Sequence, residues 1–268
     1  MSALITLTTD FGLRGNYSGA LKGAILSVCP QAQIVEITHE IGPQDIEEGV
    51  YVTSCAWPYY LPGAVHLAVV DPGVGTDRKA IAIRSPQGVF IGPDNGLLSA
   101  CLPPQSRPAA EGAITLPPTF EAFHLVEPKY FRAEVSHTFH GRDLFGPVAG
   151  HVASGVPLEA LGPALAEVHA LPRTTATQDG GAINGSILHI DTYGNLVTNI
   201  PGEWLPAGPI SVDIAGARAP GLGRTYGEAS ALFALVTSDG WLAVALPNSS
   251  AAAKLAASRR DPVRVTRA

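Results

Sequence analysis

The stretch "VVDPGVGTDR" carries a carboxylate, Asp71, and a guanidinium, Arg78, seven positions apart across a glycine turn. A turn that folds the chain back lets the guanidinium return to the carboxylate, where it keeps the acid ionised and oriented. A carboxylate held in this way can polarise a water molecule or accept its proton. The glycines do not form a nucleotide-binding motif, because Arg78 replaces the third glycine of G-x-G-x-x-G and no Gly-Lys-Ser/Thr follows.

A second cluster of polar side chains lies in "SHTFHGRDLF", where His137 and His140 are three apart and Arg142 and Asp143 follow. In a helix the two imidazoles would share a face and could bind a metal, but no glutamate accompanies them as in a zincin. We expect no metal site, since His, Arg and Asp together suit proton transfer better. A surface loop whose side chains satisfy one another remains the alternative.

The third cluster is in "HIDTYGNLVTNI", where Asp191 and Asn195 flank Tyr193. These residues offer an acceptor for an amine, an amide for hydroxyls or ring nitrogens, and an aromatic face for stacking. A plain hairpin turn would also use glycine and asparagine here. Nucleophilic acyl transfer is not indicated, because the chain has no Gly-x-Ser-x-Gly elbow and no cysteine in a motif with histidine.

The elements that must position these residues alternate between strands and helices in the first part of the chain. Helical spacing predicts helices at 17–30 and 45–60, between strand-like runs such as "ALITLTTD", "AVHLAVVD" and "GVFIGPD". This order favours an α/β domain with a mainly parallel sheet, whose ligands bind at the carboxyl ends of the strands. Asp10, Asp71 and Asp94 each follow a predicted strand, so we expect a polar pocket at one sheet edge, although Asp-Gly turns alone could explain each of them.

The second part of the chain has a different pattern. Residues 166–181 lose periodicity and are predicted to be a linker between an α/β domain at 1–165 and a domain at 182–268. Short alternating segments separated by Gly, Pro and Asn turns predict that the second domain is a small all-β, barrel-like fold.

Composition excludes several classes of function. The 268 residues carry a net charge of -6 and only 15% charged residues, with no long basic block, so nucleic acid is not an expected partner. Three scattered cysteines, Cys29, Cys55 and Cys101, indicate buried thiols and no disulfide framework. The first residues lack a signal-peptide pattern and no apolar run reaches spanning length, so we expect no membrane partner and a cytoplasmic location.

Six stretches resemble, in order and spacing, the S-adenosyl-L-methionine (SAM) hydroxide adenosyltransferase family of adenosine-forming hydrolases, relatives of fluorinase and chlorinase: "TTDFG", "DIEEG", "VVDPGVGTDR", "GPDNGLLS", "TFHGRDLF" and "DTYGNLVTNI". The resemblance spans about residues 3 to 265. It implies hydrolysis of SAM to adenosine and L-methionine, through attack of activated water or hydroxide on ribose C5′. It further implies that SAM is a substrate with no cofactor, and a homotrimer that holds SAM between the N-terminal domain of one subunit and the C-terminal domain of its neighbour.

The resemblance also implies roles for single residues. An Asp-Arg-His set that orients and activates water matches Asp71, Arg78 and His140. The other matches are contacts to substrate: Asp10 to the ribose hydroxyls, Asp191 to the methionine amine, Asn195 to the nucleoside, Tyr193 and Tyr226 as aromatic walls, Ser238 to the methionine carboxylate, and the backbone of 246–249, including Asn248, to adenine.

Departures from the halogenases argue against halide chemistry. His140 and Gly141 stand where fluorinase has its halide serine and an aromatic neighbour, and Asp71 replaces a tyrosine. The halogenase insertion is reduced to "PQG", and Asp239 replaces an arginine. A SAM hydrolase is therefore the leading hypothesis. The alternatives are a SAM- or adenosine-binding protein in which Asp71 and Arg78 merely lock a turn, and, less favoured, a SAM-dependent halogenase.

Overall fold

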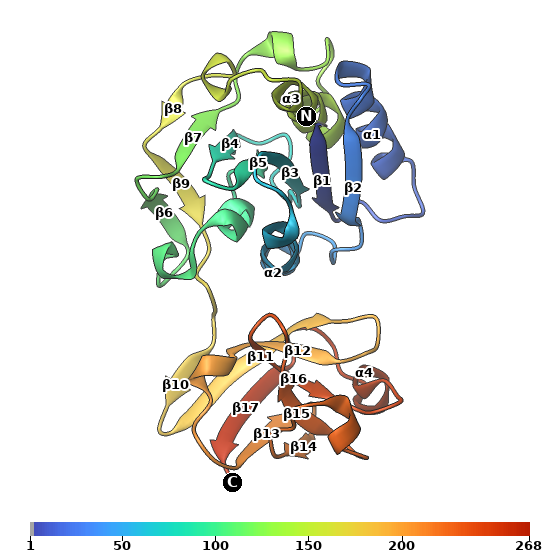
Figure 1. Ribbon diagram of the computed structural model, residues 1–268, viewed down its shortest axis with the longest axis vertical. Coiled ribbons are helices and arrows are strands. Elements are labelled where there is room, and N and C mark those ends of the chain that lie inside the picture. Colours follow the sequence, from blue (N-terminus) through green and yellow to red (C-terminus); the bar gives the residue numbers. More distant parts are fainter. Residues whose placement is uncertain (1–2) are drawn as a thin grey trace. The chain divides into compact units, whose positions relative to one another are not determined.

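The computed structural model describes residues 3–268, which divide into two compact units after Arg173 (Figure 1). The N-terminal unit holds a seven-stranded sheet in the order β2-β1-β3-β5-β4-β7-β8. The first four of these strands are mutually parallel and the others pair antiparallel. The strands are β1 (Leu4–Thr9), β2 (Gln33–Thr38), β3 (Ala64–Val69), β4 (Ala80–Arg84), β5 (Gly88–Pro93), β7 (Glu121–His124) and β8 (Ala164–Leu165).

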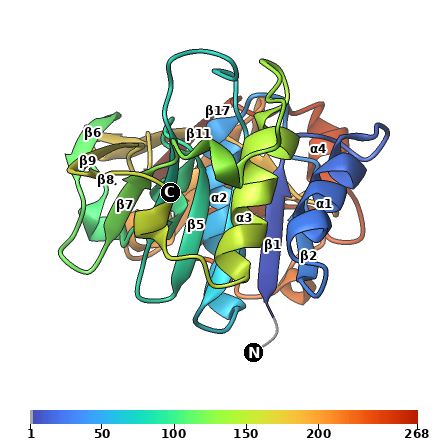
Figure 2. The same cartoon turned by 90° about the horizontal axis from the view of Figure 1, so that it is seen from above.

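Helices cover both faces of this sheet. Helices α1 (Tyr17–Val28) and α3 (Gly146–Ala153) lie together on one face, as Figure 2 shows, and bury Leu21, Ile25 and Val148 against β1 and β3. Helix α2 (Ile46–Ala56) packs into a second apolar cluster with Val70 and Phe90. The helix ends four residues earlier than the pattern predicts, because Pro58 lacks the N–H that would continue it and a 3-10 turn, Trp57–Tyr59, follows.

The C-terminal unit is an antiparallel sheet in the order β14-β13-β17-β11-β12-β16-β15, with β10 added beside β11. Gly223 N donates to Ala234 O at 2.8 Å and so joins the segment after β14 to β15, which makes the sheet barrel-like. Its core holds Leu196, Val244 and Val265. The strands are β10 (Thr177–Asp179), β11 (Ala182–Ile190), β12 (Leu196–Pro201), β13 (Ile210–Ile214), β14 (Ala217–Pro220), β15 (Phe233–Val236), β16 (Trp241–Ala245) and β17 (Pro262–Arg267). Helix α4 (Ala251–Leu255) lies between β16 and β17 in the sequence.

The fold class expected from the sequence is confirmed: an α/β unit with parallel strands at its centre is followed by a β unit. Two short strands fall within 166–181, since β9 (Glu167–Ala170) pairs with β6 (Gly112–Thr115) and β10 belongs to the C-terminal sheet. Cys29 and Cys101 are buried free thiols, and Cys55 is a half-buried one. Within residues 3–268, no helix has the length and apolarity that crossing a bilayer requires.

The buried imidazole of His66, on the central strand β3, predicts a loss of stability in acid. His66 is 2% exposed, stacks on Phe90 with ring centroids 4.6 Å apart, and shares a 2.8 Å hydrogen bond with Thr6 Oγ1. Burial lowers its pKa from 6.5 to about 4. Between these two pH values the unfolded chain binds a proton that the folded chain does not, so stability falls as the pH falls through this window.

We therefore expect His66→Gln to reduce the pH dependence of stability, by up to about 3 kcal/mol between pH 7 and pH 4. The measurement is the free energy of unfolding in urea at several pH values. His137→Gln, which changes an exposed imidazole, is the control and should keep the wild-type dependence. An unchanged pH dependence in His66→Gln would show that His66 does not carry the effect.

Candidate active site

The parallel strands bring two of the three strand-end carboxylates together. Asp10 follows β1 and Asp71 follows the adjacent strand β3, at the carboxyl edge of the sheet. The Asp10 carboxylate accepts a hydrogen bond from Gln44 N at 2.9 Å. Burial raises the pKa of Asp10; the bond from Gln44 opposes this rise, and the negative charge of Asp71 adds to it.

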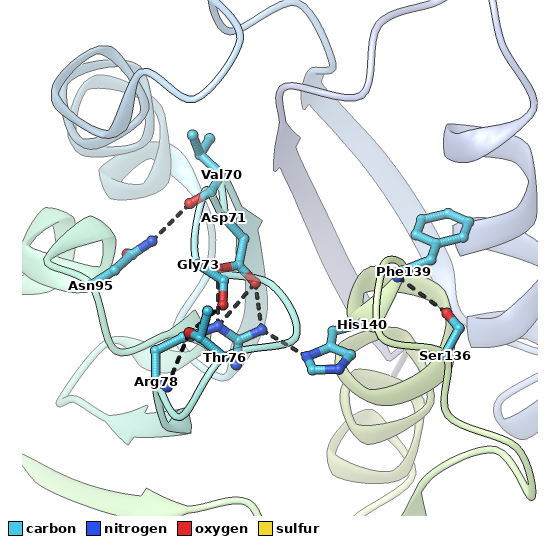
Figure 3. A network of polar contacts seen from close by, with 9 residues as sticks. All are labelled: Val70, Asp71, Gly73, Thr76, Arg78, Asn95, Ser136, Phe139 and His140. Atoms are coloured by element: carbon cyan, nitrogen blue, oxygen red, sulfur yellow. Dashed lines mark hydrogen bonds and ion pairs between the residues drawn. The ribbon is translucent and has the colours of Figure 1, made fainter.

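Asp71, Arg78 and His140 form one hydrogen-bonded chain (Figure 3). Arg78 Nε donates to both Asp71 oxygens at 2.9 and 3.0 Å, and Arg78 Nη2 donates to Oδ2 of the same carboxylate. Nη2 also lies 2.8 Å from His140 Nδ1. The Asp71 and Arg78 side chains are only 5% and 11% exposed, so their pairing is weakly screened by solvent. The guanidinium further lies 5.3 Å from the centre of the Phe145 ring.

The glycine turn between Asp71 and Arg78 is held by its own backbone. Val74 N donates to Asp71 O at 3.2 Å, and Thr76 N and Oγ1 both donate to Gly73 O, at 3.1 and 2.7 Å. Asn95 Nδ2 donates to the carbonyl of Val70 at 2.9 Å and so fixes the strand end before the turn. The chain therefore reverses within a few residues, as the sequence predicts, and returns Arg78 to Asp71.

Gly75 connects this turn to the segment that carries His140. Its φ is +78°, and a Cβ there would collide with the carbonyl oxygen of His137. Only glycine allows both this backbone conformation and this close approach. Glycine at position 75 thus lets the turn lie against the segment that carries His140.

We expect Gly75→Ala to destabilise the protein by about 2 kcal/mol and to lower activity, because strain and collision must separate the two segments. Unfolding in urea and the rate of turnover measure the two effects. Gly63→Ala is the matched control, since Gly63 also has a positive φ, +92°, but open space around its Cβ position. Equal losses in both variants would mean that backbone strain alone, and not the contact with His137, matters.

His140 is the first residue of a helical segment, a π-turn over Gly141–Phe145 that continues into α3. Because Arg78 has no acceptor, His140 Nδ1 must accept the hydrogen bond, so the neutral ring carries its proton on Nε2. Burial and the nearby Arg78 charge lower the pKa of His140, while Asp71 and Asp143 oppose this. The imidazole is thus neutral near pH 7, with an N–H free to donate.

Asp94, the third strand-end carboxylate, is used differently. Its Oδ1 accepts from His169 N at 2.7 Å, and its own N–H donates to Lys79 O at 2.9 Å. Burial raises the pKa of Asp94, and the bond from His169 offsets part of this rise. Asp94 thus links β9 to the end of β5 by hydrogen bonds, which is a structural role. The position of an aspartate after a strand does not by itself distinguish this role from a contact with a ligand.

The C-terminal unit carries four of the other sequence-predicted residues, Tyr193, Asn195, Tyr226 and Asn248, in the wall of one cavity of about 810 Å³. Asn195 lies in its wall and donates through Nδ2 to Asp191 at 2.7 Å, and Asp191 also accepts from Tyr193 N at 2.9 Å. Tyr193 and Tyr226 are 79% and 50% exposed, so both rings present surface to a ligand. The lining residues are Tyr193, Asn195, Tyr226, Gly227, Leu246, Pro247, Asn248, Ser249 and Ser250.

Comparison with known proteins decides the family. A model of the SAM hydroxide adenosyltransferase N-terminal domain matches residues 5–162, and a model of the corresponding C-terminal domain matches residues 185–264. The chain belongs to the SAM hydroxide adenosyltransferase family. This confirms the resemblance seen in the sequence.

Individual relatives agree with this assignment to the SAM hydroxide adenosyltransferase family. A protein of Salinispora arenicola named (R)-S-adenosyl-L-methionine hydrolase is 37% identical over 267 residues, which cover 98% of this chain and 97% of that protein. A fluorinase of an Actinoplanes species is 29% identical over 226 residues, which cover 74% of this chain and 71% of the fluorinase. The crystal structure of an uncharacterized conserved protein from Thermotoga maritima is similar with a TM-score of 0.83 and 30% identity, and covers 98% of this chain and 100% of that one.

One residue that the family resemblance implies lies away from the cavity. Ser238 is an exposed residue in the turn between β15 and β16, whereas Leu246–Ser250 follow the other end of β16. Within residues 3–268, no group of three or more His, Cys, Asp or Glu side chains is arranged to hold a metal ion.

Sequence reasoning missed Ser250 as a contributor to these sites, and it named Asp143 in a polar cluster without predicting its burial. Ser250 lines the cavity, caps α4 by accepting from Ala253 N at 3.0 Å, and packs on Gly194, whose φ of +79° and missing Cβ make room for it. A serine directly before the helical run "AAAKL" is an N-cap signal that could have identified it. Asp143, three residues after His140, is fully buried. Its neighbours in the sequence are polar and charged, so they do not indicate this burial.

Proposed function

We propose that this protein hydrolyses SAM to adenosine and L-methionine. The observation that carries the proposal is the chain Asp71–Arg78–His140, which pairs a buried carboxylate with two groups able to orient it and a water molecule. The relative from Salinispora arenicola, similar over almost its whole length, is named a hydrolase of this substrate. The fluorinase relative covers less of the chain at lower identity, and Asp71 and His140 are suited to water rather than to halide.

The proposed step is an in-line attack of water on ribose C5′. The water oxygen forms a bond to C5′, the C5′–S bond breaks, and its electron pair moves to sulfur, which leaves as the neutral thioether of methionine. The sulfonium needs no general acid, because bond breaking discharges its positive charge. The catalyst must therefore supply alignment and a base for the water proton, and the step balances without a cofactor.

Asp71 is the proposed acceptor of that proton. His140 Nδ1 already accepts from Arg78, so protonation there would require the guanidinium to leave. Asp71 Oδ1 accepts from Arg78 Nε alone and keeps a further lone pair, and Arg78 holds the carboxylate in place. Neutral His140 then donates its Nε2–H to orient the water oxygen. Arg78 is the link that aligns both groups.

The remaining residues are proposed to bind the substrate. Asp10 contacts the ribose hydroxyls, the Asp191–Asn195 pair contacts the polar atoms of SAM, and the two tyrosines of the cavity stack on the adenosyl group. Asn248, in the cavity wall, contacts adenine, and Ser238 contacts the methionine carboxylate. We further propose a cytoplasmic homotrimer, in which the N-terminal unit of one copy and the C-terminal unit of its neighbour complete each site.

Incubation of the purified protein with SAM, followed by chromatography for adenosine and methionine, tests the proposal. Formation of both products in equal amounts is expected. SAM that binds but persists would contradict hydrolysis and favour a binding protein. Parallel reactions with fluoride or chloride test for a 5′-halo product, and light scattering tests for a mass three times that of one chain.

A further inference from the structure

We infer that Asp143 is a positioning residue: it closes the turn Ser136–His140 and thereby presents Nδ1 of His140 to Arg78. The inference rests on the proposed function and adds to it a residue that touches neither substrate nor water. It is drawn from a carboxylate that is fully buried, 0% exposed, close to the candidate catalytic histidine.

The Asp143 carboxylate gathers hydrogen bonds from the residues on either side of His140. Ser136 donates to Oδ2 through both its backbone N, at 3.0 Å, and its Oγ, at 2.8 Å. Arg142 donates through Nε to Oδ1 at 2.6 Å and through Nη2 to Oδ2 at 2.8 Å. Arg132 Nε lies 3.4 Å from Oδ1. The carboxylate therefore joins the start of the turn at Ser136 to the helical segment after it.

Phe139, the residue before His140, is held at both its backbone polar groups. Its N–H donates to Ser136 Oγ at 3.1 Å, the same hydroxyl that Asp143 holds, as Figure 3 shows for the Ser136–Phe139 bond. Its carbonyl accepts from Arg142 N and Asp143 N at 3.2 and 3.1 Å. Because the peptide groups on both sides of Phe139 are held by hydrogen bonds, the direction of the Cα–Cβ bond of His140 is fixed as well.

Asp143 is unsuited to proton transfer itself. Although burial raises its pKa, the hydrogen bonds from Arg142 and Ser136 outweigh this and hold the pKa at about 2. The group is thus an anion throughout the neutral range, and its lone pairs are already used by four donor groups. Its effect on the reaction must pass through the geometry of His140.

Asp143→Asn is the primary test, because the amide keeps the shape but turns an N–H toward either Arg142 or Ser136. We expect kcat for SAM hydrolysis to fall about ten- to a hundredfold, with KM nearly unchanged. In the His140→Ala background the same substitution should cause no further loss. An equal loss in both backgrounds would overturn the inference, since it would mean that Asp143 does not act through His140. Asp213→Asn, which breaks an exposed ion pair with Arg218, is the matched control.

A second variant and a second readout keep the test decisive. Ser136→Ala removes one donor and leaves the buried charge paired, so it should fold even if Asp143→Asn does not, and should lower kcat in the same direction. Wild-type kcat in Ser136→Ala would overturn the inference. The ¹⁵N chemical shift of His140 Nδ1, assigned by its loss in His140→Gln, should move in either variant. The chemical shift can be measured without turnover, so it tests how Asp143 positions His140 even if the wild-type protein forms no adenosine. That absence of adenosine would overturn only the proposed function.

Discussion

Replacing Asp71 with asparagine is expected to lower kcat for SAM hydrolysis by about a hundred- to ten-thousand-fold, the range that a well-placed base contributes. The amide has almost the same shape and can still accept a hydrogen bond from Arg78, but it cannot accept the water proton. Since the role proposed for this carboxylate is to act on water and not on SAM, KM should change little. Steady-state kinetics with chromatographic detection of adenosine measures both constants.

Asp94→Asn is the control for this experiment. Asp94 also follows a strand at the same edge of the sheet, and an asparagine at this position could still accept a hydrogen bond from His169 N. We expect Asp94→Asn to retain activity close to that of the wild type. An Asp71→Asn variant with normal kcat would remove Asp71 from the mechanism and leave the ion pair with Arg78 as a turn-locking contact.

The difference between Asp71 and Asp94 shows how far sequence alone predicts this site. Hydrophobic patterns and turn residues predict the order of strands and helices, and parallel pairing then brings Asp10 and Asp71 to one edge. The return of Arg78 is equally local, because the glycine turn lies within seven residues. Asp94 satisfies the same local rule, but its partner His169 is 75 residues away, and no local pattern records that contact.

Burial of polar groups was harder to predict than their position along the chain. "TFHGRDLF" identifies His140 as a candidate, but only the folded structure puts Asp143 out of solvent and Gly75 against His137 O. The approach of Gly75 to His137 joins segments far apart in sequence, which periodicity does not describe. In the C-terminal unit, the hairpin residues Asp191 and Asn195 were predictable from the residues themselves. Residues 246–249 were implied only by the family resemblance, because their contribution to a cavity depends on how the strands pair.

Arg78→Ala is expected to have the second large effect, and on two quantities at once. The substitution removes every donor that Arg78 gives to Asp71 and His140, so kcat should fall about a hundredfold or more. It also leaves a 5% exposed carboxylate without its counter-ion, which should lower the free energy of unfolding by about 3 kcal/mol. Kinetics and urea unfolding on the same preparation measure the two losses.

The control for Arg78→Ala compares the loss of a buried ion pair with the loss of an exposed one. Arg218→Ala removes a guanidinium from Asp213, but these side chains are 69% and 40% exposed, so the stability loss should stay below about 1 kcal/mol. Methylguanidine added to Arg78→Ala supplies the missing planar cation and should restore part of the activity, because the cavity left by the side chain lies between Asp71 and His140. If stability falls as expected but kcat is unchanged, Arg78 holds the fold of the turn and takes no part in aligning the water.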